Sequence, residues 1–225
     1  SSNLMLFLLE KRNVDSIIYL DSDLYFFNSP ESILNEIEEE SLAIIGHNYS
    51  KERKYLEKIA GKFNVSFVYA KNNLEGRQAI KWWAEKVIEW CYDRYEDNKF
   101  GDQKYLDKFP ELFPYVYIIK NKGSNVAPWN INSYEISLKN GKVYVDDQPL
   151  IFYHFHRFYL LKENKYIPAS RYYISDMAEK HIYKPYFEEI NKMLKLVRKI
   201  DSNFNYGFKK ISPIQTFIET LFKFK

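Results

Sequence analysis

Two aspartates, Asp21 and Asp23, directly follow a short apolar run and are the side chains best placed for chemistry. The apolar residues 17–20 predict a strand buried on both faces, and α/β sheets keep their ligand-binding groups at strand ends. Because side chains alternate along an extended chain, both carboxylates would face the same side and could bind one hard cation. The pattern makes a site for a metal and a phosphate the first hypothesis, but two aspartates in this position can equally end a strand and cap a turn.

A second pair of possible ligands, His154 and His156, lies in the apolar stretch of residues 150–156, which predicts a strand. Alternation places the two imidazoles on one face. A lone buried histidine is usually structural, but two on one face beside an aspartate pair are better candidates for metal ligands.

The elements that must position these side chains alternate between helix and strand patterns, which indicates an α/β fold. Residues 78–95 have the clearest amphipathic helical spacing. Asn140 and Gly141, between two β-like runs, predict a hairpin. The remaining predicted helices cover residues 4–12 and 30–37, and the remaining strands cover residues 42–45, 63–69 and 115–119.

Composition sets outer limits on function. The 225 residues are 46% hydrophobic and 28% charged, which is typical of a globular protein. The small net charge of +3 does not indicate a nucleic-acid-binding protein. The aromatic content of 18% could serve sugar or base stacking, but Tyr and Phe more often fill cores. Cys91, the single cysteine, suits a reducing compartment. No apolar run reaches the roughly 20 residues needed to cross a bilayer, so we expect a cytoplasmic protein.

The last 42 residues differ from the rest, because residues 184–225 carry nine basic and four acidic side chains. Residues 188–200 have helical spacing, and residues 211–224 are again apolar and basic. This predicted basic helical extension, residues 184–225, could lie on the inner, anionic face of a membrane. It could equally pack on its own domain with its lysines outside, which the pattern favours somewhat more.

The order of several short motifs resembles the GT-A-fold nucleotide-sugar glycosyltransferases, most closely their glycogenin-like and bacterial galactosyltransferase-like branch. The D-x-D segment is followed in order by the family's F-N strand, D-Q pair, aromatic-Asn pair and H-F strand; here these are Phe63-Asn64, Asp102-Gln103, Trp129-Asn130 and His154-Phe155. Two positions depart from the pattern, since Ser66 and Arg157 stand where the family usually has glycine, and no K-P-W follows the histidines.

The resemblance implies a GT-A-like mixed sheet flanked by helices in residues 1–183, and a metal-dependent glycosyltransferase acting on a nucleotide-diphosphate donor, a UDP-sugar, and a glycan or glycoconjugate acceptor in polysaccharide biosynthesis. It implies Mn²⁺, or Mg²⁺, bound by Asp21, Asp23 and His154, and mixed oxygen and imidazole ligands suit Mn²⁺. It places Asn64 and the catalytic candidates Asp102 and Gln103 at the donor sugar, and Trp129 and Asn130 near the acceptor. Asp102 could instead cap a helix that starts at Gln103.

The position of the D-x-D segment leads to one more expectation. In the fold that the chain resembles, an N-terminal βαβ portion that holds the nucleotide base precedes this segment, whereas here only the predicted helix at residues 4–12 does. We therefore expect the N-terminal nucleotide-binding part of the domain to be missing from these residues.

Other classes fit the motifs less well. A haloacid dehalogenase-type phosphatase also begins with D-x-D, but its motif normally continues with Thr or Val where this chain has Tyr25. A P-loop ATPase is excluded because no G-x-x-x-x-G-K-[ST] occurs. The stronger alternative is a glycosyltransferase-like domain that binds a sugar or a partner without turnover.

Overall fold

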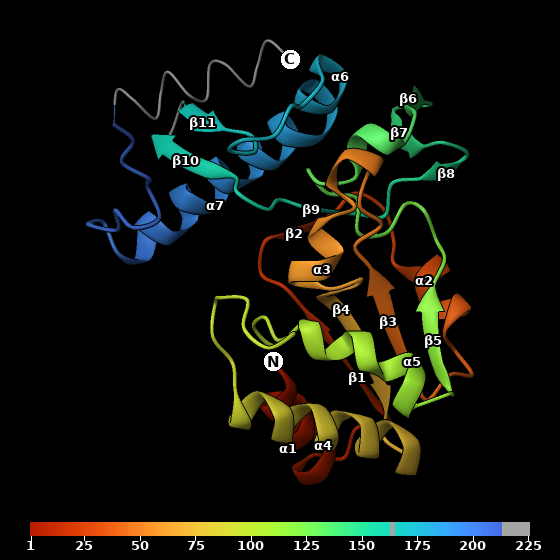
Figure 1. Cartoon of the computed structure of the whole chain (residues 1–225). Coiled ribbons are helices and arrows are strands. Elements are labelled where there is room, and N and C mark those ends of the chain that lie inside the picture. Colours follow the sequence, from red (N-terminus) through yellow and green to blue (C-terminus); the bar gives the residue numbers. More distant parts are fainter. Residues whose placement is uncertain (163–164, 213–225) are drawn as a thin grey trace.

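The protein is a mixed α/β structure, and the computed structural model describes residues 1–162 and 165–212 (Figure 1). The α-helices are α1 (Ser2–Lys11), α2 (Glu31–Glu36), α3 (Leu56–Ala60), α4 (Leu74–Glu89), α5 (Phe109–Leu112), α6 (Asp176–Ala178) and α7 (Lys184–Ile200). The strands are β1 (Ser16–Leu20), β2 (Leu24–Phe26), β3 (Leu42–Gly46), β4 (Phe63–Lys71), β5 (Val116–Ile119), β6 (Ile136–Lys139), β7 (Lys142–Val145), β8 (Gln148–Pro149), β9 (Phe152–His154), β10 (Tyr159–Lys162) and β11 (Lys165–Ile167).

The main sheet has the strand order β1-β4-β3-β5. β4 pairs antiparallel with both of its neighbours, whereas β3 and β5 are parallel. The sheet is therefore mixed. The predicted fold class, an α/β domain with a mixed sheet flanked by helices and followed by a C-terminal helix, is confirmed.

Alternation along β4 divides the core between the two faces of this sheet. Val68 packs in one cluster with Met5 of α1 and Trp83 of α4, so these two helices cover one face (Figure 1). Phe67 faces the other way and packs with Ile33 of α2 and with Phe152. Because β4 carries apolar residues on both faces, it is buried from both sides, with eight of its nine residues buried.

The prediction that β1 is buried on both faces is wrong. Ser16 and Leu20 are exposed, and the residues between them are half-buried. Within the part of the chain that the structure describes, β1 pairs only with β4 and lies at the edge of the sheet. An apolar run of this length does not distinguish an edge strand from a central one, because strand order depends on long-range pairing.

Helix α4 begins and ends earlier than the predicted helix at residues 78–95. Its start is set by Asn73, whose side chain accepts a hydrogen bond from the backbone N–H of Gly76 at 2.9 Å. The predicted hairpin is confirmed as β6 and β7. Asn140 and Gly141 in its turn have φ of 51° and 76°, and such a two-residue turn requires left-handed backbone at both positions.

The C-terminal elements form a third core around Tyr153 and Tyr183, whose hydroxyls are 2.7 Å apart. Helix α7 adds Tyr186, whose ring stacks on that of Phe155 with 3.7 Å between the ring centroids. The helical prediction for residues 188–200 is confirmed by α7, whereas most of the predicted stretch 211–224 lies outside the described residues. No described helix is both long enough and apolar enough to cross a lipid bilayer. The division of the chain at residues 183 and 184 stays a prediction.

Candidate metal and substrate site

Asp21, Asp23 and His154 come together in the folded chain. Their candidate ligand atoms all lie within 4.8 Å of one another. His154 Nε2 is 3.1 Å from Asp23 Oδ1 and 4.0 Å from Asp21 Oδ2. Two carboxylates and one imidazole form a donor set that suits a divalent ion such as Mn²⁺.

Three strand ends position this group. Asp21 follows β1 and Asp23 precedes β2, which pairs antiparallel with β9 so that Leu24 lies opposite His154. The backbone N–H of Phe155 donates to the carbonyl of Asp23 at 2.8 Å and continues this pairing. The Tyr19 hydroxyl donates to Asp21 Oδ1 at 3.0 Å and fixes that carboxylate. The β2–β9 pairing therefore brings the histidine to the aspartates.

The two carboxylates differ electrostatically. Burial raises the pKa of Asp21 above its usual value, although the charge of His154 and the hydrogen bond from Tyr19 oppose this rise. Burial also acts to raise the pKa of Asp23, but the hydrogen bond and charge of His154 outweigh it and hold that pKa below its usual value. Asp23 is therefore the carboxylate more firmly held in the charged form that a cation binds.

The ring of His154 is oriented for ligation. Its side chain is 6% exposed, and its Nδ1 is buried without a hydrogen-bond partner among the described residues. Nε2 is the nitrogen that faces the two carboxylates. The residues therefore fit a cation held by two oxygens and Nε2.

A cavity of about 550 Å³ opens beside this cluster. It is large enough for a drug-sized or sugar-sized ligand. Its lining combines the three candidate metal ligands with imidazole, aromatic and aliphatic side chains. The lining residues are Asp21, Asp23, His47, Tyr49, Leu56, Ile59, Ala60, Asn64, Asp93, Phe100, Gln103, Trp129, His154, His156, Arg157 and Tyr172.

Three of the other predicted site residues, Asn64, Gln103 and Trp129, also line this cavity. Trp129 is held in place by its indole N–H, which donates to the carbonyl of His47 at 2.8 Å, and its ring lies edge-on to His154 with centroids 5.0 Å apart. The structure therefore brings residues from β4, the loop after α4 and the loop before β6 to the candidate metal ligands. Their roles stay predictions.

Asp102 and Asn130 are not among the cavity-lining residues. The Asp102 side chain accepts a hydrogen bond from the Ser1 hydroxyl, and its carbonyl accepts one from the Trp83 indole at 2.7 Å. Asp102 does not cap the short 3₁₀ helix Lys104–Lys108, which has no side-chain cap. The Asn130 side chain is bonded within its loop and to His47, since it donates to the carbonyls of His47 and Asn125 and accepts from Ala127.

Ser66 and Arg157, which stand where the resembled family usually has glycine, are accommodated differently in the fold. Ser66 is fully buried in β4, and its hydroxyl donates to Asn125 Oδ1 at 2.9 Å. Arg157 keeps the backbone conformation that favours glycine, with φ of 59°. His156 precedes it, and burial is the main cause that lowers the pKa of His156 to about 4, so this ring is neutral at pH 7.

Sequence reasoning missed His47, which follows β3 and supports Asn64. Asn64 Oδ1 accepts from the backbone N–H of Ser66, which turns its amide nitrogen toward His47 Nε2 at 3.0 Å. Nε2 must then be the acceptor, so the neutral ring carries its proton on Nδ1. Ligand-binding groups are expected at the ends of strands, and His47 directly follows the apolar run of β3. The argument that identified Asp21 and Asp23 after β1 therefore applies to His47 as well.

His47 is expected to make stability depend on pH. Burial lowers the pKa of His47 to about 3 in the folded protein, whereas an unfolded histidine binds a proton near pH 6.5. The folded state therefore loses stability as the pH falls from about 6.5 toward 3, by about 2 kcal/mol between pH 7 and pH 5. Urea unfolding at pH 7 and pH 5 should show a smaller loss for His47→Gln than for wild type. His181→Gln, outside this cavity, is the matched control, and equal losses in His47→Gln and wild type would contradict the prediction.

Comparisons with known proteins add partial likenesses. No protein-family model matches the chain. The chain is 35% identical over 206 residues to uncharacterized protein YfnD of Bacillus subtilis (strain 168), covering 89% of this chain and 66% of that protein. It is 30% identical over 202 residues to uncharacterized protein YfnF of the same strain, covering 87% of this chain and 66% of that protein. The chain thus spans just under two thirds of the length of these relatives.

Among solved structures, the chain is similar to glycosyltransferases. The galactosyltransferase LgtC, solved in complex with donor and acceptor sugar analogs, matches with a TM-score of 0.43 and 20% identity over 67% of this chain and 56% of that one. The glycosyltransferase GlyE of Streptococcus pneumoniae TIGR4 matches with a TM-score of 0.36 and 20% identity over 54% of this chain and 28% of that one.

Proposed function

We propose that the protein is a metal-dependent glycosyltransferase that transfers a sugar from a nucleotide-diphosphate donor, a UDP-sugar, to a glycan or glycoconjugate acceptor. The observation that carries this proposal is the group of Asp21, Asp23 and His154 at the wall of the 550 Å³ cavity. A cation held there would lie where a diphosphate and the sugar attached to it can enter. The motif order in the sequence supports the same assignment.

The residues of the site have different roles in the proposed reaction. Asp21, Asp23 and His154 would hold Mn²⁺ or Mg²⁺, which supplies positive charge to the diphosphate leaving group. The amides of Asn64 and Gln103 can donate to and accept from sugar hydroxyls. Trp129 offers an aromatic face and edge for packing against a sugar ring. The hydrogen bonds that fix Asn64 and Trp129 keep them preorganised.

The test is binding followed by turnover. The melting temperature is measured with a panel of nucleotide sugars, each with and without Mn²⁺. At least one donor should raise the melting temperature, and it should do so only in the presence of the metal. Hydrolysis or transfer from that donor then separates an enzyme from a sugar-binding domain without turnover. Binding without any release of nucleoside diphosphate would favour the non-catalytic alternative, and no binding of any donor would contradict both.

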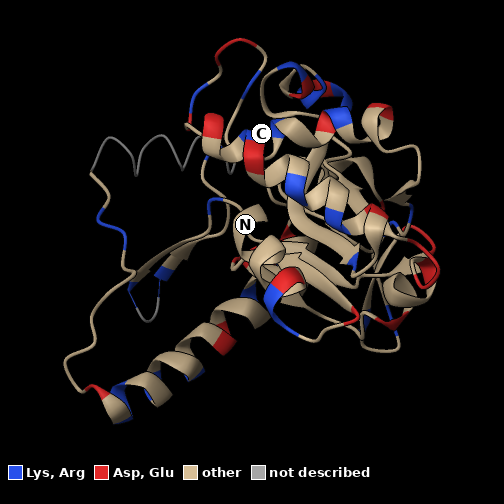
Figure 2. Ribbon diagram, turned by 90° about the horizontal axis from the view of Figure 1, so that it is seen from below, with Lys and Arg blue, Asp and Glu red and all other residues tan. Residues whose placement is uncertain are grey.

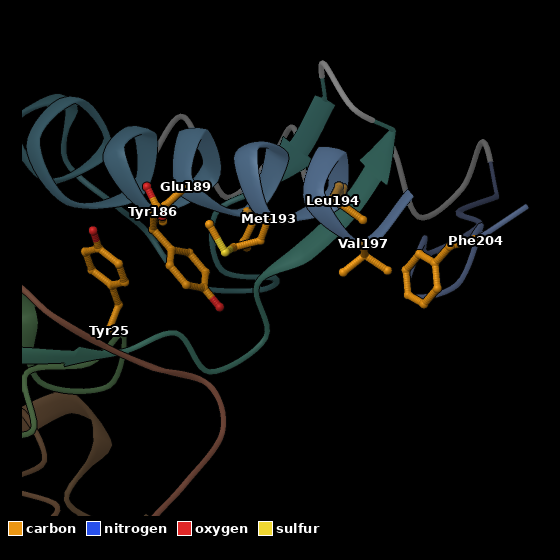
Figure 3. A pocket seen from close by; sticks show the side chains of 8 residues that line it. Tyr25, Tyr186, Glu189, Met193, Leu194, Val197 and Phe204 are labelled. Atoms are coloured by element: carbon orange, nitrogen blue, oxygen red, sulfur yellow. The ribbon is translucent and has the colours of Figure 1, made fainter. Parts of the chain in front are cut away.

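We also propose peripheral membrane contact through α7. This helix extends away from the main sheet and carries Lys and Arg along its length (Figures 1 and 2). Apolar side chains beside them are exposed, with Leu196 at 46% and Ile200 at 92%. Next to them lies an apolar groove of about 330 Å³ between α7 and β2 (Figure 3), lined by Tyr25, Tyr186, Glu189, Ile190, Met193, Leu194, Val197 and Phe204. Exposed apolar and basic side chains on one helix suit an anionic lipid surface.

Replacing the exposed apolar residues of α7 is expected to weaken attachment to liposomes. Each large apolar side chain that enters a bilayer contributes about 1.5–3 kcal/mol, so Leu196→Gln with Ile200→Gln should lower co-sedimentation with anionic liposomes at least about tenfold. Raised salt should lower it further, since exposed charges are screened within about 10 Å. Leu138→Gln, an exposed leucine of β6, is the control. Unchanged sedimentation of the double variant would mean that α7 only packs on its own domain.

A further inference from the structure

The charges around the cavity are unbalanced. Among the described residues that line it, Asp21, Asp23 and Asp93 are acidic, whereas Arg157 is the one Lys or Arg. The two aspartates of the metal cluster already offset much of the charge of a bound divalent cation. A diphosphate beside that cation is strongly anionic, so it would face uncompensated negative charge unless a cationic side chain meets it.

Other cations near the cavity wall are engaged elsewhere. Lys104, next to Gln103, is 7% exposed and donates from Nζ to the carbonyl of Glu57 at 2.8 Å and to Asp107 at 3.0 Å. Arg53 lies over the ring of Tyr172, with 4.1 Å between its guanidinium carbon and the ring centroid. Arg157 is exposed, and no ion pair of its side chain is seen within the described residues. It is therefore the guanidinium left for a ligand.

The backbone at Arg157 supports a functional reason for this side chain. The N–H of Phe158 donates to the carbonyl of Phe155 at 2.9 Å and closes a tight turn, with Arg157 at its third position. The φ of Arg157 is 59°, and turns with positive φ at that position favour Gly or Asn. An arginine held in left-handed backbone at the edge of a cavity is the kind of local strain that persists at ligand-binding sites.

We propose that Arg157 binds the diphosphate of the donor and holds it against the cation at Asp21, Asp23 and His154. This inference rests on the proposed function. Arg157 lies three residues after His154, in the turn that directly follows β9. A guanidinium presents a planar set of donors that can bind two phosphate oxygens at once, and charge-assisted bonds of this kind are stronger than neutral ones.

The test uses the full chain and isothermal titration with UDP and with inorganic pyrophosphate, each with Mn²⁺. Arg157→Gly should bind both ligands about 10- to 100-fold more weakly than wild type. Its melting temperature without ligand should stay near that of wild type, because glycine relieves the left-handed backbone while it loosens the unfolded chain. Arg171→Gly is the matched control: it removes an exposed arginine with φ of 64° that does not line the cavity, and it should bind as wild type does.

The outcomes separate this inference from the proposed function. If wild type binds neither ligand, the proposed metal and diphosphate site fails and the role of Arg157 fails with it. If wild type binds but Arg157→Gly binds equally well, the inference alone is overturned. Equal weakening in Arg157→Gly and Arg171→Gly also overturns it, since surface charge in general would then be the cause. Should Arg157→Gly unfold, Arg157→Asn gives the same comparison because asparagine tolerates left-handed backbone.

Discussion

Asp23→Ala is expected to abolish Mn²⁺-dependent nucleotide binding and leave the fold intact. The Asp23 carboxylate lies 3.1 Å from His154 Nε2, and its pKa is held below the usual value, so it is the charged oxygen ligand of the proposed site. Changes to groups that only support a metal ligand cost about 10–100-fold in affinity, and loss of a ligand should cost more. Its side chain is 44% exposed, so the melting temperature should change little. Titration with Mn²⁺, alone and with UDP, measures the effect.

Three further variants define the site. His154→Ala should weaken Mn²⁺ binding, whereas His156→Ala should matter less, because His156 is not among the clustered candidate ligands. Asp93→Ala removes another cavity-lining carboxylate outside the cluster and should leave Mn²⁺ affinity near that of wild type. Equal Mn²⁺ affinity in wild type and Asp23→Ala would refute the metal assignment.

Gly123→Ala is expected to destabilise the protein by at least about 3 kcal/mol. A Cβ at Gly123 would lie 2.0 Å from the carbonyl oxygen of Pro149 and 3.2 Å from the backbone nitrogen of Ile151. These are backbone atoms, so no side chain can rotate away. The carbonyl of Gly123 also accepts from Ile151 and Phe152, which holds the start of β9 in place. Urea unfolding should show the loss, and Mn²⁺ affinity should fall because β9 carries His154.

A second glycine provides the control for this substitution. A Cβ at Gly101 meets nothing within 4 Å, although its φ of 53° is left-handed. Gly101→Ala should therefore cost only the backbone term, about 1–2 kcal/mol. If Gly123→Ala costs no more than Gly101→Ala, the close approach of Gly123 to the Pro149 carbonyl does not govern stability.

Much of the candidate site could be predicted from the sequence because its chemistry is local. A short apolar run followed by Asp21 and Asp23 predicts ligands at a strand end, and the alternation of side chains along a strand predicts that His154 and His156 lie on the same face. Local sequence patterns also predicted the helix α7 and the hairpin at Asn140 and Gly141. Each of these features depends on residues only a few positions apart in the sequence.

Other features depend on what a segment meets after folding. The exposure of β1 is set by its edge position, and the hydrogen bonds of Asn130 within its loop and to His47 are set by the packing of that loop. The support of Asn64 by His47 joins two strands of the sheet. The sequence also marks Arg157 as a departure from a glycine pattern, but only the structure shows that its backbone is left-handed.

The sequence by itself determined which donor atoms this chain offers to a cation and the kind of elements that carry them, because residue type and periodicity act over a few positions. The tertiary structure decided that β2 pairs with β9, and this pairing brings His154 to the two aspartates. It also decided which predicted residues line the cavity and which do not. The physical reason is that strand pairing and burial are set by contacts between residues far apart in the chain, and these do not follow from any local pattern.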